Sequence, residues 1–143
     1  MEKEKKSSNK IIIIIGVLLV VVAVVLFSVL NKPSNEKKLK TSLTEMGRNF
    51  YENFYYEQVG SSADERSTLL SKFTTIGIKI DLDNLGRYNN GEFSSKIKEF
   101  KNNKTDEKCS KTNTKVVIYP KSPYGKTDYT IKTELDCGFE EKK

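Results

Sequence analysis

The sequence predicts an α+β domain that follows an N-terminal transmembrane helix. Three patterns lead to this fold class: an uninterrupted apolar run at 11–30, apolar residues at helical spacing over 36–58, and alternating apolar and polar residues within 115–135. The expected order is a membrane helix, an amphipathic helix, a second helix and a small antiparallel sheet that ends in a disulfide-braced β-hairpin. The chain has 143 residues, which leaves room for one domain beyond the membrane helix.

The apolar run at 11–30 contains no charged residue. A helix of this length rises about 30 Å, which matches the hydrocarbon thickness of a bilayer. The run is longer than the roughly 7–15 apolar residues of a cleaved signal peptide. The residues at its end, Ser28-Val29-Leu30, also lack the small-x-small pattern of a cleavage site. We therefore interpret 11–30 as an uncleaved signal anchor that holds the chain in the lipid bilayer.

The orientation of this anchor is predicted from two features, because lysines flank the run on both sides and the positive-inside rule gives a tie. A short N-terminal tail without a signal of its own most simply stays in the cytoplasm. The two cysteines of the larger domain suit an oxidising compartment. We expect 1–10 to be a cytoplasmic tail, 31–35 a linker and 36–143 an extracytoplasmic domain at the cell membrane.

Residues 36–58 predict an amphipathic helix with one apolar stripe. The residues of the stripe are spaced by four, three, four and four positions: Leu39, Leu43, Met46, Phe50 and Phe54. Three tyrosines widen it: Tyr51, Tyr55 and Tyr56. Core packing is the expected role of these aromatic side chains, and a binding surface is the alternative.

Two further helices and a strand follow. Ser62 and Glu65 have the spacing of a capping box, which predicts a second helix over 63–74. Alternation at 76–82 predicts a strand. After a turn at Asn89-Asn90-Gly91, apolar spacing favours a third short helix at 93–101, with a strand as the alternative.

The lysine-rich segment 101–114 is expected to be an exposed connection. Its alternative role is contact with anionic envelope polymers or lipid headgroups.

A β-hairpin is the clearest local prediction. The runs 115–120 and 128–135 have β-type patterns, and the segment between them is rich in Pro, Gly and Ser. In an antiparallel pair, the numbers of opposite residues have a constant sum. If Cys109 and Cys137 are opposite each other, the centre of the hairpin falls at Pro123, within the expected loop. This register makes two further pairs: Val117 with Tyr129, and Tyr119 with Thr127.

The same reasoning predicts a disulfide between Cys109 and Cys137 at the open end of the hairpin. Closing a loop of about 29 residues stabilises a domain by roughly 3–4 kcal/mol in the chain-entropy description. The register also puts the two cysteines on one face of the hairpin with these side chains: Val117, Tyr119, Tyr129, Ile131 and Leu135. Two free thiols in a cytosolic domain are the alternative.

The composition and the motifs argue against several classes of function. The net charge of +6 comes from mixed signs, which is not the pattern of a nucleic-acid-binding protein. The absence of His removes the usual general base near neutral pH. No motif predicts a cofactor or a metal: the segment from Asp81 to Glu92 approaches a calcium loop, but Leu85 occupies a position that needs a side-chain oxygen. An enzyme that relies on carboxylates such as Asp81, Asp83 or Glu92 is an alternative.

The order of elements resembles type IV pilins and pseudopilins, in which a hydrophobic N-terminal helix leads into an amphipathic helix and then a small antiparallel sheet with a disulfide. This resemblance implies a subunit of an envelope assembly. The residues around the start of the apolar run differ from that family: Asn9-Lys10 precede Ile11 where the family has Gly or Ala, and Ile15 stands where it has Glu. The function we expect is a non-enzymatic binding or structural module at the envelope, with a protein partner there.

Overall fold

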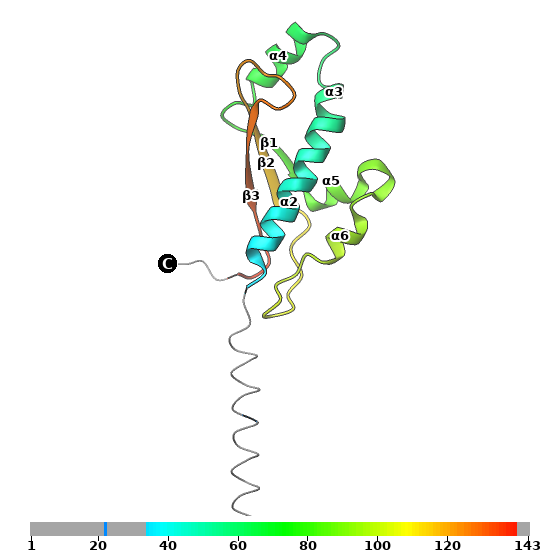
Figure 1. The fold of residues 1–143 in the computed structure, drawn as a ribbon, viewed down its shortest axis with the longest axis vertical. Coiled ribbons are helices and arrows are strands. Elements are labelled where there is room, and N and C mark those ends of the chain that lie inside the picture. The colour runs from blue at the N-terminus through cyan, green and yellow to red at the C-terminus, as the bar shows by residue number, and fades with distance from the viewer. Residues whose placement is uncertain (1–21, 23–33, 140–143) are drawn as a thin grey trace, which may run out of the picture. The chain divides into compact units, whose positions relative to one another are not determined.

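The computed structural model describes residue 22 and residues 34–139, and these divide between two units that meet at 33/34 (Figure 1). The predicted tail at 1–10, all but one residue of the predicted anchor at 11–30, and the linker residues 31–33 lie outside the described residues. In the described part, no helix has both the length and the apolar character needed to cross a membrane. The second unit begins at Ser34 and carries the fold.

The second unit is an α+β domain, as predicted. Its elements in chain order are helix α2 (Glu36–Phe50), the π-helical turn η1 (Tyr51–Tyr55), α3 (Tyr56–Gln58), α4 (Ala63–Ser71), strand β1 (Ile78–Asp81), α5 (Leu82–Arg87), the 3-10 turn η2 (Tyr88–Gly91), α6 (Ser94–Lys98), β2 (Lys115–Pro120) and β3 (Tyr129–Glu134). The three strands form one antiparallel sheet in the order β1-β2-β3. The central strand β2 therefore pairs with a strand on each side.

Helix α2 packs across one face of this sheet (Figure 1). The first half of the predicted stripe is buried there: Leu39, Leu43 and Met46. The helix approaches β2 closely at Gly47, because a Cβ atom on that residue would lie 2.5 Å from Cγ1 of Val116. The absence of a side chain at Gly47 thus sets the distance between helix and sheet.

In the second half of the predicted stripe, Phe50 packs against the core but Phe54 does not. Phe54 is 44% exposed and Phe50 only half-buried, whereas Tyr51 is completely buried. The cause is the π-helical turn η1, in which the N–H of Tyr56 donates to the carbonyl of Tyr51. A π turn contains an extra residue. It therefore rotates the following side chains away from the positions that an α-helical spacing predicts.

Helix α4 begins as predicted but ends earlier. The Ser62 hydroxyl accepts a hydrogen bond from the backbone N–H of Glu65 at 3.2 Å, as an N-cap does. The Glu65 carboxylate accepts from the N–H of Ser61 at 2.8 Å and from the Ser61 hydroxyl, and these bonds lower the pKa of that carboxyl group. After Ser71 the chain forms a turn, which leaves Ile76 62% exposed, so the strand predicted at 76–82 begins at Ile78.

The hairpin is confirmed, but its predicted register is wrong. Lys115 lies opposite Glu134, and Val117 lies opposite Lys132 rather than Tyr129. Tyr119 lies opposite Thr130 rather than Thr127. Because the shift is an odd number of residues, the predicted apolar face is also wrong: Val116 and Ile118 share a face with Tyr129 and Ile131, and Val117 and Tyr119 lie on the other.

The physical reason is a turn just before β2. The N–H of Thr114 donates to the carbonyl of Ser110 at 3.0 Å, so the chain folds back between Cys109 and the strand. On the other side, β3 leads to Cys137 through only two residues. The turn adds residues between Cys109 and β2 that have no counterpart between β3 and Cys137. The two cysteines therefore do not lie opposite each other in the register of the two strands.

Candidate functional site

The disulfide between Cys109 and Cys137 is confirmed. Both cysteines are buried, and no cysteine of the described residues is free. The N–H of Ser110 donates to the carbonyl of Asp136 at 2.7 Å, and the N–H of Asp136 donates to the Thr114 hydroxyl at 3.0 Å. The segment after Cys109 is therefore attached to the end of β3 by covalent and polar contacts together.

Helix α5 is positioned on this same segment. Its N-cap is Asp81, whose carboxylate accepts from the N–H of Asn84 at 2.8 Å. The N–H of Leu82 donates to the carbonyl of Thr114 at 3.1 Å, and the N–H of Asp83 donates to that of Lys111 at 3.3 Å. The residues that approach a calcium loop in sequence thus form a capped helix.

Helix α6 returns beside α5 after the predicted turn. Asn89 and Asn90 have positive φ angles of 45° and 55°, and Gly91 has a φ of 86°, which is the left-handed backbone that Asn and Gly tolerate. The helix spans Ser94–Lys98, so the helix favoured at 93–101 is confirmed in type and is shorter than predicted. Phe93 and Phe100 at its ends are buried and hold it against the core.

A pocket of about 430 Å³ lies between α5, α6 and the segment that contains Cys109. Its lining combines apolar and basic side chains: Leu82, Asp83, Gly86, Arg87, Ser94, Ile97, Lys98, Phe100, Lys108, Cys109 and Lys111. Leu82, Phe100 and Cys109 are buried, so the floor of the pocket is apolar. This volume is within the range of about 300–1,000 Å³ that is typical of sites for small ligands.

The charge around the pocket is unbalanced. Asp83 is the only carboxylate among its lining residues, and it forms an ion pair with Arg87 one turn later in α5. Lys98, Lys108 and Lys111 are exposed and form no ion pair with any residue that the structure describes. The pocket is therefore lined by three lysines without an ion-pair partner among the described residues, next to one apolar floor.

The wall that carries Lys108 is held by a hydrogen-bonded loop at 101–108. The N–H of Cys109 donates to the carbonyl of Phe100 at 3.0 Å, where the two sides of the loop meet. Inside the loop, Asn102 is only 2% exposed, and its side chain accepts from the N–H of Lys104 at 2.9 Å and donates to the carbonyl of Gly138 at 3.0 Å. The prediction of an exposed connection at 101–114 is thus wrong for its buried members: Asn102, Cys109 and Thr114.

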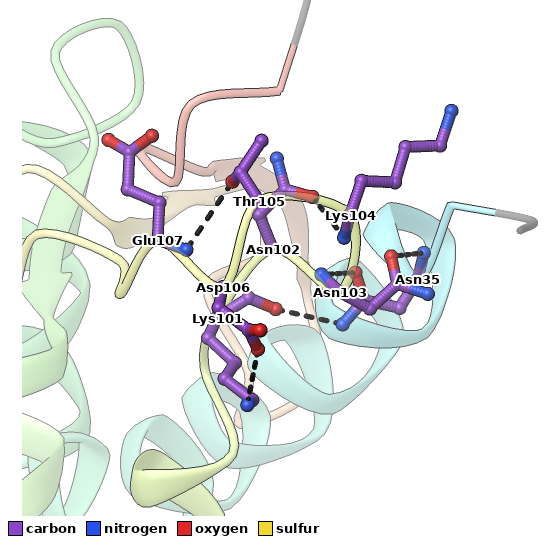
Figure 2. Close-up of polar contacts among 8 residues, drawn as sticks. All are labelled: Asn35, Lys101, Asn102, Asn103, Lys104, Thr105, Asp106 and Glu107. Atoms are coloured by element: carbon purple, nitrogen blue, oxygen red, sulfur yellow. Dashed lines mark hydrogen bonds and ion pairs between the residues drawn. The ribbon is translucent and has the colours of Figure 1, made fainter. Parts of the chain in front are cut away.

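The loop is also joined to the start of α2 (Figure 2). The N–H of Asn35 donates to Oδ1 of Asn103, and the N–H of Asn103 donates to Oδ1 of Asn35, each at 3.2 Å. The Asn35 side chain also donates to the carbonyl of Lys101 at 2.9 Å. Asn35, which the sequence assigns to the linker, is thus bound to the same wall of the pocket.

The three carboxylates considered for catalysis have separate environments. Asp83 lines the pocket, whereas Asp81 and Glu92 do not. The Asp81 carboxylate caps α5, and that of Glu92 accepts from the Asn89 amide at 2.7 Å. The pocket therefore does not combine two of these carboxylates.

A tyrosine cluster lies on the other side of the domain, where η1 meets β3. The rings of Tyr51 and Tyr129 are in edge contact with centroids 5.0 Å apart, and the Tyr129 hydroxyl donates to the Glu52 carboxylate. Burial, and then the hydrogen bond with Glu52, raises the pKa of Tyr129 to about 12. Burial also raises the pKa of Tyr51, whose hydroxyl has no hydrogen-bond partner among the described residues.

The comparisons with known proteins yield no relative: no family model, curated protein or solved structure matches the chain.

The basic pocket is the feature that sequence reasoning missed. Its lysines fall within or next to a lysine-rich segment, and such a segment is usually a solvated surface. Only the folding of α5 and α6 against Cys109 gathers them around one floor. The weak signal was the contrast between these lysines and the apolar Ile97 and Phe100 among them.

Proposed function

We propose that the chain is a single-pass, membrane-anchored binding module whose folded domain lies outside the cytoplasm at the cell envelope. Residues 11–30 form the anchor, 1–10 stay in the cytoplasm, and the domain presents a ligand-binding pocket on the outer side. The observation that carries this proposal is the buried disulfide between Cys109 and Cys137. Disulfides form and persist in oxidising compartments and are rare in the cytosol.

The pocket supports a binding role over a purely structural one. A structural module needs a stable surface but no concave site, and this domain has a pocket of about 430 Å³ with an apolar floor. The pocket holds one carboxylate, and that group is engaged with Arg87. Binding is therefore the chemistry that its side chains support best, because Lys ammonium groups attract anions and the floor accepts an apolar group.

The test is protease accessibility in cells. Protease added to intact cells or spheroplasts should digest the domain and leave a short fragment that contains 11–30. Protection of the domain until the membrane is lysed would overturn the orientation. In the same cells, alkylation before and after reduction should give two modified cysteines only after reduction.

Intact mass distinguishes this module from a pilin-like subunit. A signal anchor keeps its N-terminus, whereas a pilin-like subunit loses a leader on maturation. We expect a mass that shows no cleavage between the tail and Ile11. A mass that corresponds to cleavage near Ile11 would favour the pilin-like alternative.

A further inference from the structure

We infer that the pocket between α5, α6 and Cys109 binds a small amphiphilic anion: an anionic group, such as a phosphate or carboxylate, carried on an apolar stem. The anionic group faces Lys98, Lys108 and Lys111, and the stem rests on the apolar floor. This inference deepens the proposed binding function and rests on it only in treating the pocket as a binding site. It does not depend on the side of the membrane on which the domain lies.

The size and shape of the pocket favour a small ligand. Its walls come from two short helices and one loop, and its volume of about 430 Å³ suits a compact molecule. An extended peptide would instead need a long groove or a free strand edge. The floor of Leu82 and Phe100, with the partly buried Ile97 beside it, offers apolar contact for an aliphatic or aromatic stem.

The charge of the pocket selects the head group. Lys98 comes from α6, whereas Lys108 and Lys111 come from the wall next to the disulfide. None of the three has an ion-pair partner in the described part of the chain, so an incoming anion need not displace an existing carboxylate. Positive charges that lie around an apolar, low-dielectric floor raise the local concentration of anions.

A second depression shows that this imbalance is not a general property of the surface. It has a volume of about 490 Å³ and is lined by two lysines and two glutamates together with Thr41 and Ser42: Lys38, Lys96, Glu45 and Glu99. Its charges balance, so it offers no net attraction for an anion. Its lysines serve as matched controls for those of the pocket.

The experiment measures binding to the purified full chain in nanodiscs of phosphatidylcholine by calorimetry, with empty nanodiscs as the blank. The probe is 2-naphthyl phosphate, which carries an anion on an apolar stem. Two control probes each have one of these features: inorganic phosphate has the anion without the stem, and 2-naphthyl glucoside has the stem without a charge. We expect the phosphate ester to bind at least tenfold more tightly than either half, with an affinity that falls as salt is added. Equal affinity of all three probes, or no measurable binding of the ester, would overturn the inference.

Two double variants with equal charge change locate the site. Lys108→Gln with Lys111→Gln should weaken binding of the ester at least fivefold, whereas Lys38→Gln with Lys96→Gln should change it less than twofold. All four lysines are exposed, and circular dichroism will verify the fold of both variants. Equal weakening by both pairs would show a non-specific charge effect and overturn the assigned site.

A third experiment distinguishes a lipid headgroup from a soluble amphiphile as the ligand. Replacing part of the phosphatidylcholine with phosphatidylglycerol offers lipid phosphate next to the domain. Competition by these nanodiscs against the ester identifies a lipid headgroup as the ligand, whereas undiminished binding identifies a soluble amphiphile. The two hypotheses can fail separately. If the ester does not bind, the orientation found by protease in cells still stands. If the protease experiment shows a cytosolic domain, the binding of the ester still stands.

Discussion

The two sides of this domain share one apolar core but differ in the contacts that are added to it. On one side, α2 and η1 pack on the sheet through apolar and aromatic side chains such as Leu43, Met46 and Tyr51. On the other side, α5 and α6 also bury apolar side chains in this core, and the pocket wall that they adjoin has in addition backbone hydrogen bonds, the Asn102 side chain and the disulfide. The packed side, which consists of α2, η1 and the sheet face beneath them, brings helix and sheet into close contact, for example where Gly47 meets Val116.

This difference indicates how a small domain can contain a pocket and remain stable. Side chains that line a pocket lack apolar contacts on one side, so the elements around the pocket need another source of stability. Here a covalent bond and a buried amide supply that source within a few residues of the pocket wall. Substitutions on the two sides should therefore differ in both magnitude and location of their effects.

The largest effect is expected from the disulfide. Replacement of both Cys109 and Cys137 with Ser should lower the free energy of unfolding by about 3–4 kcal/mol, because the unfolded chain is no longer cross-linked. Urea unfolding of the full chain in nanodiscs, followed by circular dichroism, measures this change. Hydrogen exchange should show the first loss of protection at 100–114 and 135–139 rather than in α2.

The control is reduction. A reductant should destabilise the native chain and leave the double variant unchanged. If the variant loses protection uniformly across both sides, the disulfide braces the whole domain and the proposed contrast between the sides is wrong.

The next effect in size lies on the packed side. Gly47→Ala adds a Cβ 2.5 Å from Cγ1 of the fully buried Val116. Overpacking of this kind costs typically about 1–3 kcal/mol, which exceeds the gain of roughly 1 kcal/mol from replacing a helical glycine. We expect a net loss of up to about 2 kcal/mol in urea unfolding.

Gly86→Ala is the matched substitution on the pocket side. Its Cβ would lie 3.3 Å from Cδ1 of Ile97, and a partly buried side chain can move by the small distance required. The same change should therefore leave stability unchanged or raise it slightly through helix propensity. Equal destabilisation by both substitutions would contradict the difference in packing between the two sides.

A smaller and more local effect is expected from Asn102→Ala. This change leaves the carbonyl of Gly138 and the N–H of Lys104 without their partner, at a cost of about 1–2 kcal/mol. Hydrogen exchange should increase at 101–108 and 135–139, with α2 unaffected. Asn53→Ala, at an exposed position of η1, is the control and should change neither quantity measurably. Increased exchange throughout the sheet would show that Asn102 supports more than the loop.

The same contrast explains what could be predicted from sequence. The α2 stripe, the cap at Ser62, the hairpin and the disulfide follow from local spacing, and all four are present. The register of the hairpin did not follow, because the turn from Ser110 to Thr114 displaces the cysteines from the ladder. The exposure of Phe54 did not follow either, because the π turn interrupts the α-helical spacing that predicts its burial. The pocket depends on contacts between separate segments, and no single pattern along the chain contains them.

The smallest changes in stability are expected in the tyrosine cluster, where hydroxyl groups lie among apolar side chains. The Tyr51 hydroxyl is buried without a hydrogen-bond partner among the described residues, so Tyr51→Phe should leave stability unchanged or raise it by up to about 1 kcal/mol. Tyr129→Phe should instead lower stability by about 1 kcal/mol, because the bond with Glu52 is lost. A loss of stability on Tyr51→Phe would mean that its hydroxyl has a partner, such as a buried water.

The pH dependence of the cluster gives a second readout with a definite sign. The pKa of Tyr129 is raised to about 12 in the folded domain, whereas an unfolded tyrosine ionises near pH 10. Above pH 10 the unfolded chain releases this proton and the folded chain retains it, so stability falls as pH rises from about 10 to 12. Urea unfolding in this range should show a shallower decline for Tyr129→Phe than for the native chain. Absorbance at alkaline pH should show one ionisable tyrosine fewer in the late-titrating group of the variant, and an identical titration in both would mean that Tyr129 is not a member of that group.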